Sequence, residues 1–281
     1  MEAATVAEAA DSSPLDRVRE WMRDHPGGVT GIVVGAIAIA LIADEGLQRV
    51  ADTGLTGLST GSILALAAVG LTLVYGILKL VNFAHGDFLT FGAYMAYLLC
   101  GTEQLGLPLW IGALFAIVTT ALLGVILEKG MWGPMRRRGA GVLQLLLMSI
   151  GLGLVIRYVI QFIWGTELRR LDVDTSTTVD FLGLSMGRMF FVAMVVAFAV
   201  LIATGLMLRY STLGKRMRAL SDNLELAETS GIDTSRVILW TWILATGFAG
   251  LAGVLSGATT QLQPEMGVEL LLPIFAVVVL G

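Results

Sequence analysis

The sequence predicts an all-α protein whose helices cross a membrane several times. Hydrophobic residues make up 56% of the 281 residues and charged residues 14%, against about 25% charged residues in an ordinary soluble domain. Apolar runs of about 20 residues recur along the chain, and this length spans a hydrocarbon core of about 30 Å. A chain of this composition could not cover its apolar surface in water. We therefore expect a polytopic transmembrane helical bundle.

Residues 1–28 are expected to form a cytoplasmic tail that precedes the transmembrane domain. The first 14 residues lack the basic start of a secretory signal. In residues 14–23, Leu15, Val18 and Met22 fall on one helical face, which favours a short amphipathic helix at the membrane surface. A poorly ordered tail is the alternative. Residues 29–281 then form the transmembrane domain.

Eight apolar segments follow the tail. The first and third are short for a complete crossing, so we expect them to tilt little or to enter the bilayer only partway. The last runs from Phe275 to Gly281 without a polar stop, so we expect the final span to be incomplete. The segments cover residues 29–43, 55–79, 87–101, 109–128, 142–164, 189–208, 236–260 and 268–281.

The placement of Lys and Arg predicts the orientation, because cytoplasmic connections carry an excess of both. A cytoplasmic N-terminus makes every second connection cytoplasmic. The opposite side then holds only Arg49, Arg169, Arg170 and Arg188. The cytoplasmic side holds Arg17, Arg19, Arg23, Lys79, Lys129, Arg136, Arg137, Arg138, Arg209, Lys215, Arg216, Arg218 and Arg236.

Glycines at helical spacing indicate close helix packing. Gly247, Gly250, Gly253 and Gly257 recur along segment 236–260, and Gly57, Gly61 and Ala65 do the same along segment 55–79. Small residues at this period let membrane helices approach closely where the hydrophobic effect does not drive association. The lone cysteine, Cys100, leaves the chain without an internal disulfide.

Polar residues interrupt the apolar sequence around residues 82–87. Asn82, His85 and Asp87 lie there, and Asn82 could cap the following helix. If this stretch lies at membrane depth, the start of a half-helix would offer backbone amides to a substrate carboxylate. A turn at the cytoplasmic membrane edge is the alternative, since Lys79 is adjacent. No metal site is expected, because the only other histidine, His25, is in the tail.

Arg157 is the clearest charge inside a predicted span. Ser149, Gly153, Arg157 and Gln161 repeat every four residues and give segment 142–164 one small and polar face. A charge in a membrane normally faces the bundle interior and has a partner. Snorkelling to the outer interface is the alternative. Asn82, His85, Asp87 and Arg157 are therefore candidates for the substrate path.

The connection 209–235 is predicted to contain its own capped helix. Ser221 or Asp222 could cap a helix over residues 221–231, and Gly231 could end it in the left-handed conformation. Leu220, Leu224 and Ala227 would share one face. Such a helix suits a docking element, although a solvated connection has the same pattern.

The same connection carries the first resemblance to a known family. A basic run at 214–219, Ala227 and the Gly-Ile-Asp at 231–233 resemble the coupling loop of permeases in branched-chain amino acid ABC importers, the LivH/LivM family. The resemblance implies that this loop contacts an ATPase subunit. The candidate coupling residues are Arg218, Leu224, Glu225, Ala227, Glu228 and Gly231.

Two further blocks resemble the same family in the same order. The first comprises residues 61–63, 70–76, 82–87 and 92–94, and the second is residues 248–255. The resemblance runs from about residue 54 to the end of the sequence. It implies a permease subunit that moves branched-chain amino acids or a related small solute across the cell membrane.

The resemblance also implies partners. They are cytoplasmic ATP-binding subunits, a second permease subunit and an extracytoplasmic solute-binding protein, which loop 165–188 could meet. No Walker A pattern is present, since Arg216 follows Gly214 and Lys215, so ATP would be bound by the partner, and we expect neither enzymatic activity nor a cofactor. The small net charge of −4 does not suggest nucleic acid. The alternatives are an ion- or proton-coupled secondary transporter and a channel for urea or amides.

Overall fold

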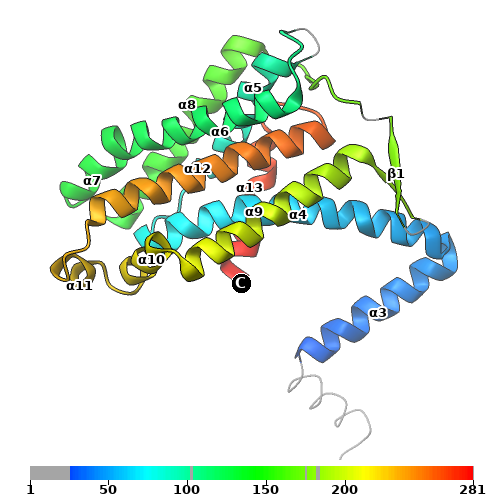
Figure 1. Ribbon diagram of the computed structural model, residues 1–281, viewed down its shortest axis with the longest axis horizontal. Coiled ribbons are helices and arrows are strands. Elements are labelled where there is room, and N and C mark those ends of the chain that lie inside the picture. Colours follow the sequence, from blue (N-terminus) through cyan, green and yellow to red (C-terminus); the bar gives the residue numbers. More distant parts are fainter. Residues whose placement is uncertain (1–25, 102–103, 175, 182–183, 281) are drawn as a thin grey trace, which may run out of the picture. The chain divides into compact units, whose positions relative to one another are not determined.

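The computed structural model describes residues 26–101, 104–174, 176–181 and 184–280. The predicted amphipathic helix at residues 14–23 lies outside them. The described chain is predominantly α-helical (Figure 1), which confirms the predicted fold class.

A helix lies in each of the eight predicted apolar segments. Among the described residues, five helices are long and apolar enough to cross a membrane: α4, α6 with its extension to Arg137, α8, α9 and α12. The eight helices are α3 (Pro26–Glu45), α4 (Leu47–Leu78), α5 (His85–Cys100), α6 (Leu109–Leu127), α8 (Val142–Trp164), α9 (Arg188–Tyr210), α12 (Thr234–Thr259) and α13 (Met266–Leu280).

The chain divides into two compact units, of which the first reaches Leu55 and the second begins at Thr56. The first unit contains α3 and the beginning of α4. α4 starts at Leu47 and not at the predicted residue 55, because the polar residues before Leu55 continue the helix. The break before it is at Gly46, whose φ of +86° favours glycine.

The core of the second unit forms around α12. This helix packs against α5 and α6, and α5 also packs against α8 and α13. The predicted glycine packing is confirmed for α12, since a methyl group on Gly253 would overlap the Leu89 carbonyl and one on Gly92 would overlap the Gly250 backbone. It is not found for Gly57 and Gly61 of α4, which have open space around them. α12 and α5 therefore approach to backbone contact, which fixes the position of α5.

Shorter elements join these helices. A π-helical turn, η1 (Glu128–Trp132), extends α6 into α7 (Gly133–Arg137), and an antiparallel hairpin of β1 (Thr178–Phe181) and β2 (Leu184–Gly187) precedes α9. The predicted single helix over 221–231 is wrong, because two helices occupy this connection: α10 (Thr212–Asp222) and α11 (Leu224–Thr229).

Two groups of loop contacts mark the two ends of the second unit. At one end α10 contacts the end of α4, where the Ser221 hydroxyl donates to the Gly76 carbonyl at 3.1 Å. At the other end Arg169 N donates to the Leu262 carbonyl at 2.9 Å and Asp172 N to the Cys100 carbonyl at 2.8 Å. We call these the α10–α11 end and the hairpin end.

Candidate functional site

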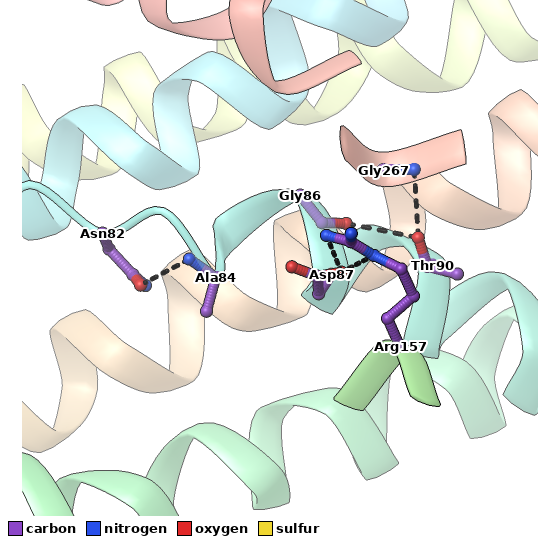
Figure 2. Close-up of polar contacts among 7 residues, drawn as sticks. All are labelled: Asn82, Ala84, Gly86, Asp87, Thr90, Arg157 and Gly267. Atoms are coloured by element: carbon purple, nitrogen blue, oxygen red, sulfur yellow. Dashed lines mark hydrogen bonds and ion pairs between the residues drawn. The ribbon is translucent and has the colours of Figure 1, made fainter. Parts of the chain in front are cut away.

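The non-helical stretch before α5 forms a turn around Asn82. Its Oδ1 accepts a hydrogen bond from Ala84 N at 3.1 Å (Figure 2). The prediction that Asn82 caps α5 is corrected, because Ala84 occupies the cap position and has no side-chain cap bond. The Asn82 side chain instead closes a short turn two residues on, as asparagine commonly does. It is fully buried, and its Nδ2 has no partner among the described residues.

An ion pair joins the first turn of α5 to α8. Arg157 Nε and Nη2 each lie 3.2 Å from Asp87 Oδ1 (Figure 2). The Asp87 side chain is 2% exposed and that of Arg157 is 19% exposed. Arg157 therefore faces the bundle interior and does not snorkel to the outer interface. Its partner, Asp87, is another candidate residue of the substrate path.

The start of α5 lies beside the middle of α8. Phe83 N donates to the Ser149 hydroxyl at 3.0 Å, and Asp87 Oδ2 lies against Gly153. Ser149 and Arg157 are seven and 15 residues into α8, about 10 and 22 Å along it at 1.5 Å per residue. Residues 82–87 therefore lie beside the interior of α8 and not beside its first turn.

His85 links the same turn to α4. Its Nε2 lies 2.9 Å from the Ala67 carbonyl oxygen. A carbonyl can only accept, so Nε2 carries the hydrogen. The His85 side chain is buried and lies next to Gly70, where a larger residue would collide with the ring and with the Ala245 carbonyl. The histidine is thus a packed contact between α4 and α5.

The N-termini of α5 and α13 cross at two glycines. A methyl group on either Gly86 or Gly267 would overlap the carbonyl of the other. Thr90 Oγ1 accepts from Gly267 N at 3.0 Å and donates to Gly86 O at 3.5 Å (Figure 2). The four residues predicted for the substrate path thus converge on one turn, and that turn supports the beginning of α13.

Sequence reasoning missed a cavity of about 630 Å³ at the hairpin end. It lies between α4, α12 and the start of α13, and contains one carboxylate, that of Glu269. The signal for it was Glu269 itself, the only charged residue within the apolar sequence of α13. The polar residues that line it are Thr60, Ser256, Thr259, Thr260, Gln261, Gln263 and Glu269.

At the opposite end, α10 and α11 form a rigid, capped element. Asn223, and not Ser221 or Asp222, caps the second helix, since its Oδ1 accepts from Leu226 N at 3.0 Å. Gly231 has a φ of +82°, as predicted for the end of the helix. Ala227 is buried in a small core with Met217 and Leu220. The element is therefore fixed to the bundle by packing.

The other candidate coupling residues lie on the surface of this element. Leu224 and Glu228 line a groove of about 600 Å³ between α11 and the η1–α7 turn, where Glu128 pairs with Arg136. Glu225 is exposed. Arg218 Nη2 donates to the Arg209 carbonyl at 3.4 Å.

The hairpin end carries the exposed acidic residue Asp174. Hydrogen bonds from the side chain and backbone of Ser176 hold the pKa of the exposed Asp174 below its usual value. In the described part of the chain, no three His, Cys, Asp or Glu side chains gather as metal ligands would.

Comparison with known proteins identifies the family. The family model described as the permease component of the branched-chain amino acid transport system matches residues 53–281. LivH of Salmonella typhimurium is 29% identical over 240 residues, which are 80% of this chain and 76% of the relative. BraD of Pseudomonas aeruginosa is 29% identical over 239 residues, with the same coverage. LivH of Methanocaldococcus jannaschii is 28% identical over 228 residues, 78% of this chain and 70% of the relative.

No solved structure matches the chain. The match to the family model covers more than half of the sequence and begins close to Thr56, where the second compact unit starts. The apolar helices and the related permeases together make this a multi-pass membrane protein. The chain belongs to the permease family of the branched-chain amino acid transport system.

Proposed function

We propose that this chain is the membrane-spanning subunit of an ATP-binding-cassette importer for branched-chain amino acids or a related small solute. The observation that carries the proposal is the family match over residues 53–281. The relatives are transport permeases, so the work done on solute would come from a separate ATP-binding subunit. A second permease chain and an extracytoplasmic solute-binding protein would complete the assembly.

The α10–α11 element supports a docking site for the ATP-binding subunit. It combines a buried anchor, Ala227, with an exposed apolar side chain, Leu226, and exposed acidic groups at Glu225 and Glu228. In an interface, such an apolar side chain can fill a pocket on the partner. We place this end in the cytoplasm, as its Lys and Arg content predicts.

The Asp87–Arg157 junction is proposed to flank the substrate path. Each charge is the other's partner, so neither is free to hold a charged solute in this conformation. The residues at the start of α5 are also packed against α4, α8 and α13. Their proposed role is to hold the N-termini of α5 and α13 together beside the path, so that the two helices move together.

Uptake by cells tests this proposal. The chain would be expressed with the second permease subunit, the ATP-binding subunit and the solute-binding protein encoded beside its gene, in a host that lacks branched-chain amino acid uptake. We expect uptake of radiolabelled leucine, isoleucine or valine that disappears when the phosphate-binding lysine of the ATP-binding subunit is replaced. Uptake that persists in that variant would favour the secondary transporter or the channel.

A further inference from the structure

The cavity at the hairpin end is lined by two sets of side chains, one polar and one aliphatic, which we call its polar wall and its aliphatic wall. Its polar residues come mainly from the end of α12 and the connection that leads to α13, with Thr60 on α4 and Glu269 on α13, while Ile63, Leu64 and Leu270 contribute aliphatic surface. A volume of about 630 Å³ lies within the usual range of small-molecule sites, about 300–1,000 Å³. The chemistry of the polar wall decides which ligand it could hold.

The threonine hydroxyls of this wall can offer only lone pairs. Thr60 donates to the Thr56 carbonyl at 3.1 Å, Thr259 to the Leu255 carbonyl at 3.0 Å and Thr260 to the Ser256 carbonyl at 2.8 Å. Because a carbonyl cannot donate, each hydroxyl uses its one hydrogen in the bond to the carbonyl four residues earlier. The three side chains therefore present acceptors to the cavity.

Glu269, which is exposed, adds a negative charge to these acceptors. One of its oxygens accepts from Gln263 Nε2 at 2.9 Å. Among the described residues that line the cavity there is no Lys, Arg or His, so this carboxylate faces no cation there. A carboxylate near hydroxyl acceptors attracts a donor with a positive charge, since charge-assisted hydrogen bonds are stronger than neutral ones.

The start of α13 does not provide an opposing anion site. Its first-turn N–H groups are used: Gly267 N donates to Thr90 Oγ1 at 3.0 Å, and Glu269 N to the Glu265 carbonyl at 3.2 Å. Met266 N and Val268 N donate to the carbonyls of residues 263 and 265. The side-chain donors that remain in the lining are the Ser256 hydroxyl, the Gln261 amide and the second N–H of the Gln263 amide, and all of them are uncharged. A carboxylate would find hydrogen bonds here but no positive charge.

We propose that this cavity binds a small aliphatic solute through its protonated amine, with Glu269 as the residue that holds the ammonium group. The aliphatic wall of Ile63, Leu64 and Leu270 would hold the branched side chain. The amine is then required for binding and the carboxylate is dispensable. That the natural solute is a branched-chain amino acid rests on the proposed function. The preference for an amine rests on the cavity alone.

Three probes that differ by one group each test the preference. They are leucine, 3-methylbutylamine, which is leucine without its carboxylate, and 4-methylpentanoate, which is leucine without its amine. Binding to the full chain in nanodiscs of zwitterionic lipid would be titrated by saturation-transfer NMR, with empty nanodiscs subtracted. We expect leucine and 3-methylbutylamine to bind, and 4-methylpentanoate not to bind.

Two substitutions identify the residue responsible. Glu269→Gln should weaken binding of both amines at least about tenfold, which corresponds to the loss of one charge-assisted hydrogen bond. Glu265→Gln removes a charge one turn earlier at a residue outside the cavity lining, and should bind like the wild type. Thr60→Val keeps the shape of the side chain but removes an acceptor, so it should weaken binding by a smaller factor.

The outcomes separate this inference from the proposed function. Unchanged amine binding in Glu269→Gln, or equal binding of 4-methylpentanoate, would overturn the inference, and leucine uptake by the assembled transporter would still stand. Amine binding that depends on Glu269 would support the inference even if the assembly carried no branched-chain amino acid. In that result the proposed function, and not the site, would be wrong.

Discussion

Arg157 Nε and Nη2 both lie 3.2 Å from the same oxygen of Asp87, which ties the middle of α8 to the first turn of α5. The two residues are 70 positions apart in the sequence. A charge inside a membrane bundle is tolerated when it has a partner, and here each residue of the pair supplies the partner of the other. The pair thus fixes the first turn of α5 against α8.

Arg157→Leu should lower the stability of the bundle, because the substitution leaves the buried Asp87 carboxylate without its cation. Removing one partner of a buried pair costs about 3–5 kcal/mol. The measurement is the melting temperature of the purified chain in detergent, followed by size-exclusion chromatography. Arg157→Lys should have a melting temperature between those of the wild type and Arg157→Leu. Arg138→Leu, at an exposed arginine, should melt like the wild type.

The double variant Asp87→Leu with Arg157→Leu sharpens this test. Both charges are then absent, so the double variant should melt above Arg157→Leu alone. If Arg157→Leu melts like the wild type, the ion pair does not support the fold.

Gly267→Ala should disrupt the crossing of α5 and α13. The added methyl group would meet the Gly86 carbonyl, a backbone atom that cannot rotate away. We expect a lower yield of folded protein and a loss of at least about 1 kcal/mol, as is usual when a well-packed core is overfilled. Gly151→Ala is the matched control, since Gly151 is exposed on α8 with open space around it. Equal effects of the two substitutions would contradict the close crossing.

Gly231→Val should impair coupling to the ATP-binding subunit. Gly231 has a φ of +82°, a conformation that a β-branched residue adopts only with strain, so the end of α11 must shift. Gly231→Asn is the control, because asparagine tolerates this conformation. Co-purification of the ATP-binding subunit and its substrate-stimulated ATP hydrolysis should fall in the valine variant and persist in the asparagine variant.

Glu228→Arg reverses a charge on the proposed docking surface without changing the backbone. We expect it to weaken co-purification of the ATP-binding subunit while the permease itself melts normally. If Glu228→Arg and Gly231→Val together retain both the partner and its stimulated hydrolysis, α10 and α11 are only a connector.

Single cysteines in a Cys100→Ala chain should report the orientation. A cysteine at Glu167, whose side chain is 82% exposed at the hairpin end, should react with an impermeant maleimide on intact cells. A cysteine at the exposed Glu225 should react only after the cells are opened. The reverse pattern would invert the proposed topology.

The sequence predicts the helices well because apolar length and glycine spacing are local properties. Each of the eight apolar segments contains a helix, and Gly231 ends α11 as its residue type suggests. The start of α4 at Leu47 was missed because residues 47–54 are too polar to extend an apolar run. A helix continues through such residues when nothing breaks it.

The site was less predictable, because its contacts join distant parts of the chain. The i+4 spacing of Ser149, Gly153 and Arg157 indicated a polar face on α8, but nothing local identified Asp87 as its partner. The cavity around Glu269 depends on three separate helices. Asn223 was passed over as a cap because Ser221 and Asp222 precede it with equally suitable side chains.

Transport driven by ATP is the central claim, and uptake by proteoliposomes tests it most directly. The chain would be reconstituted with the second permease subunit and the ATP-binding subunit, with solute-binding protein outside and ATP enclosed. The account predicts accumulation of radiolabelled leucine that requires enclosed ATP and is unchanged by ionophores that collapse proton and sodium gradients. Accumulation that proceeds with enclosed ADP, or that stops with the ionophores while ATP is present, would contradict it.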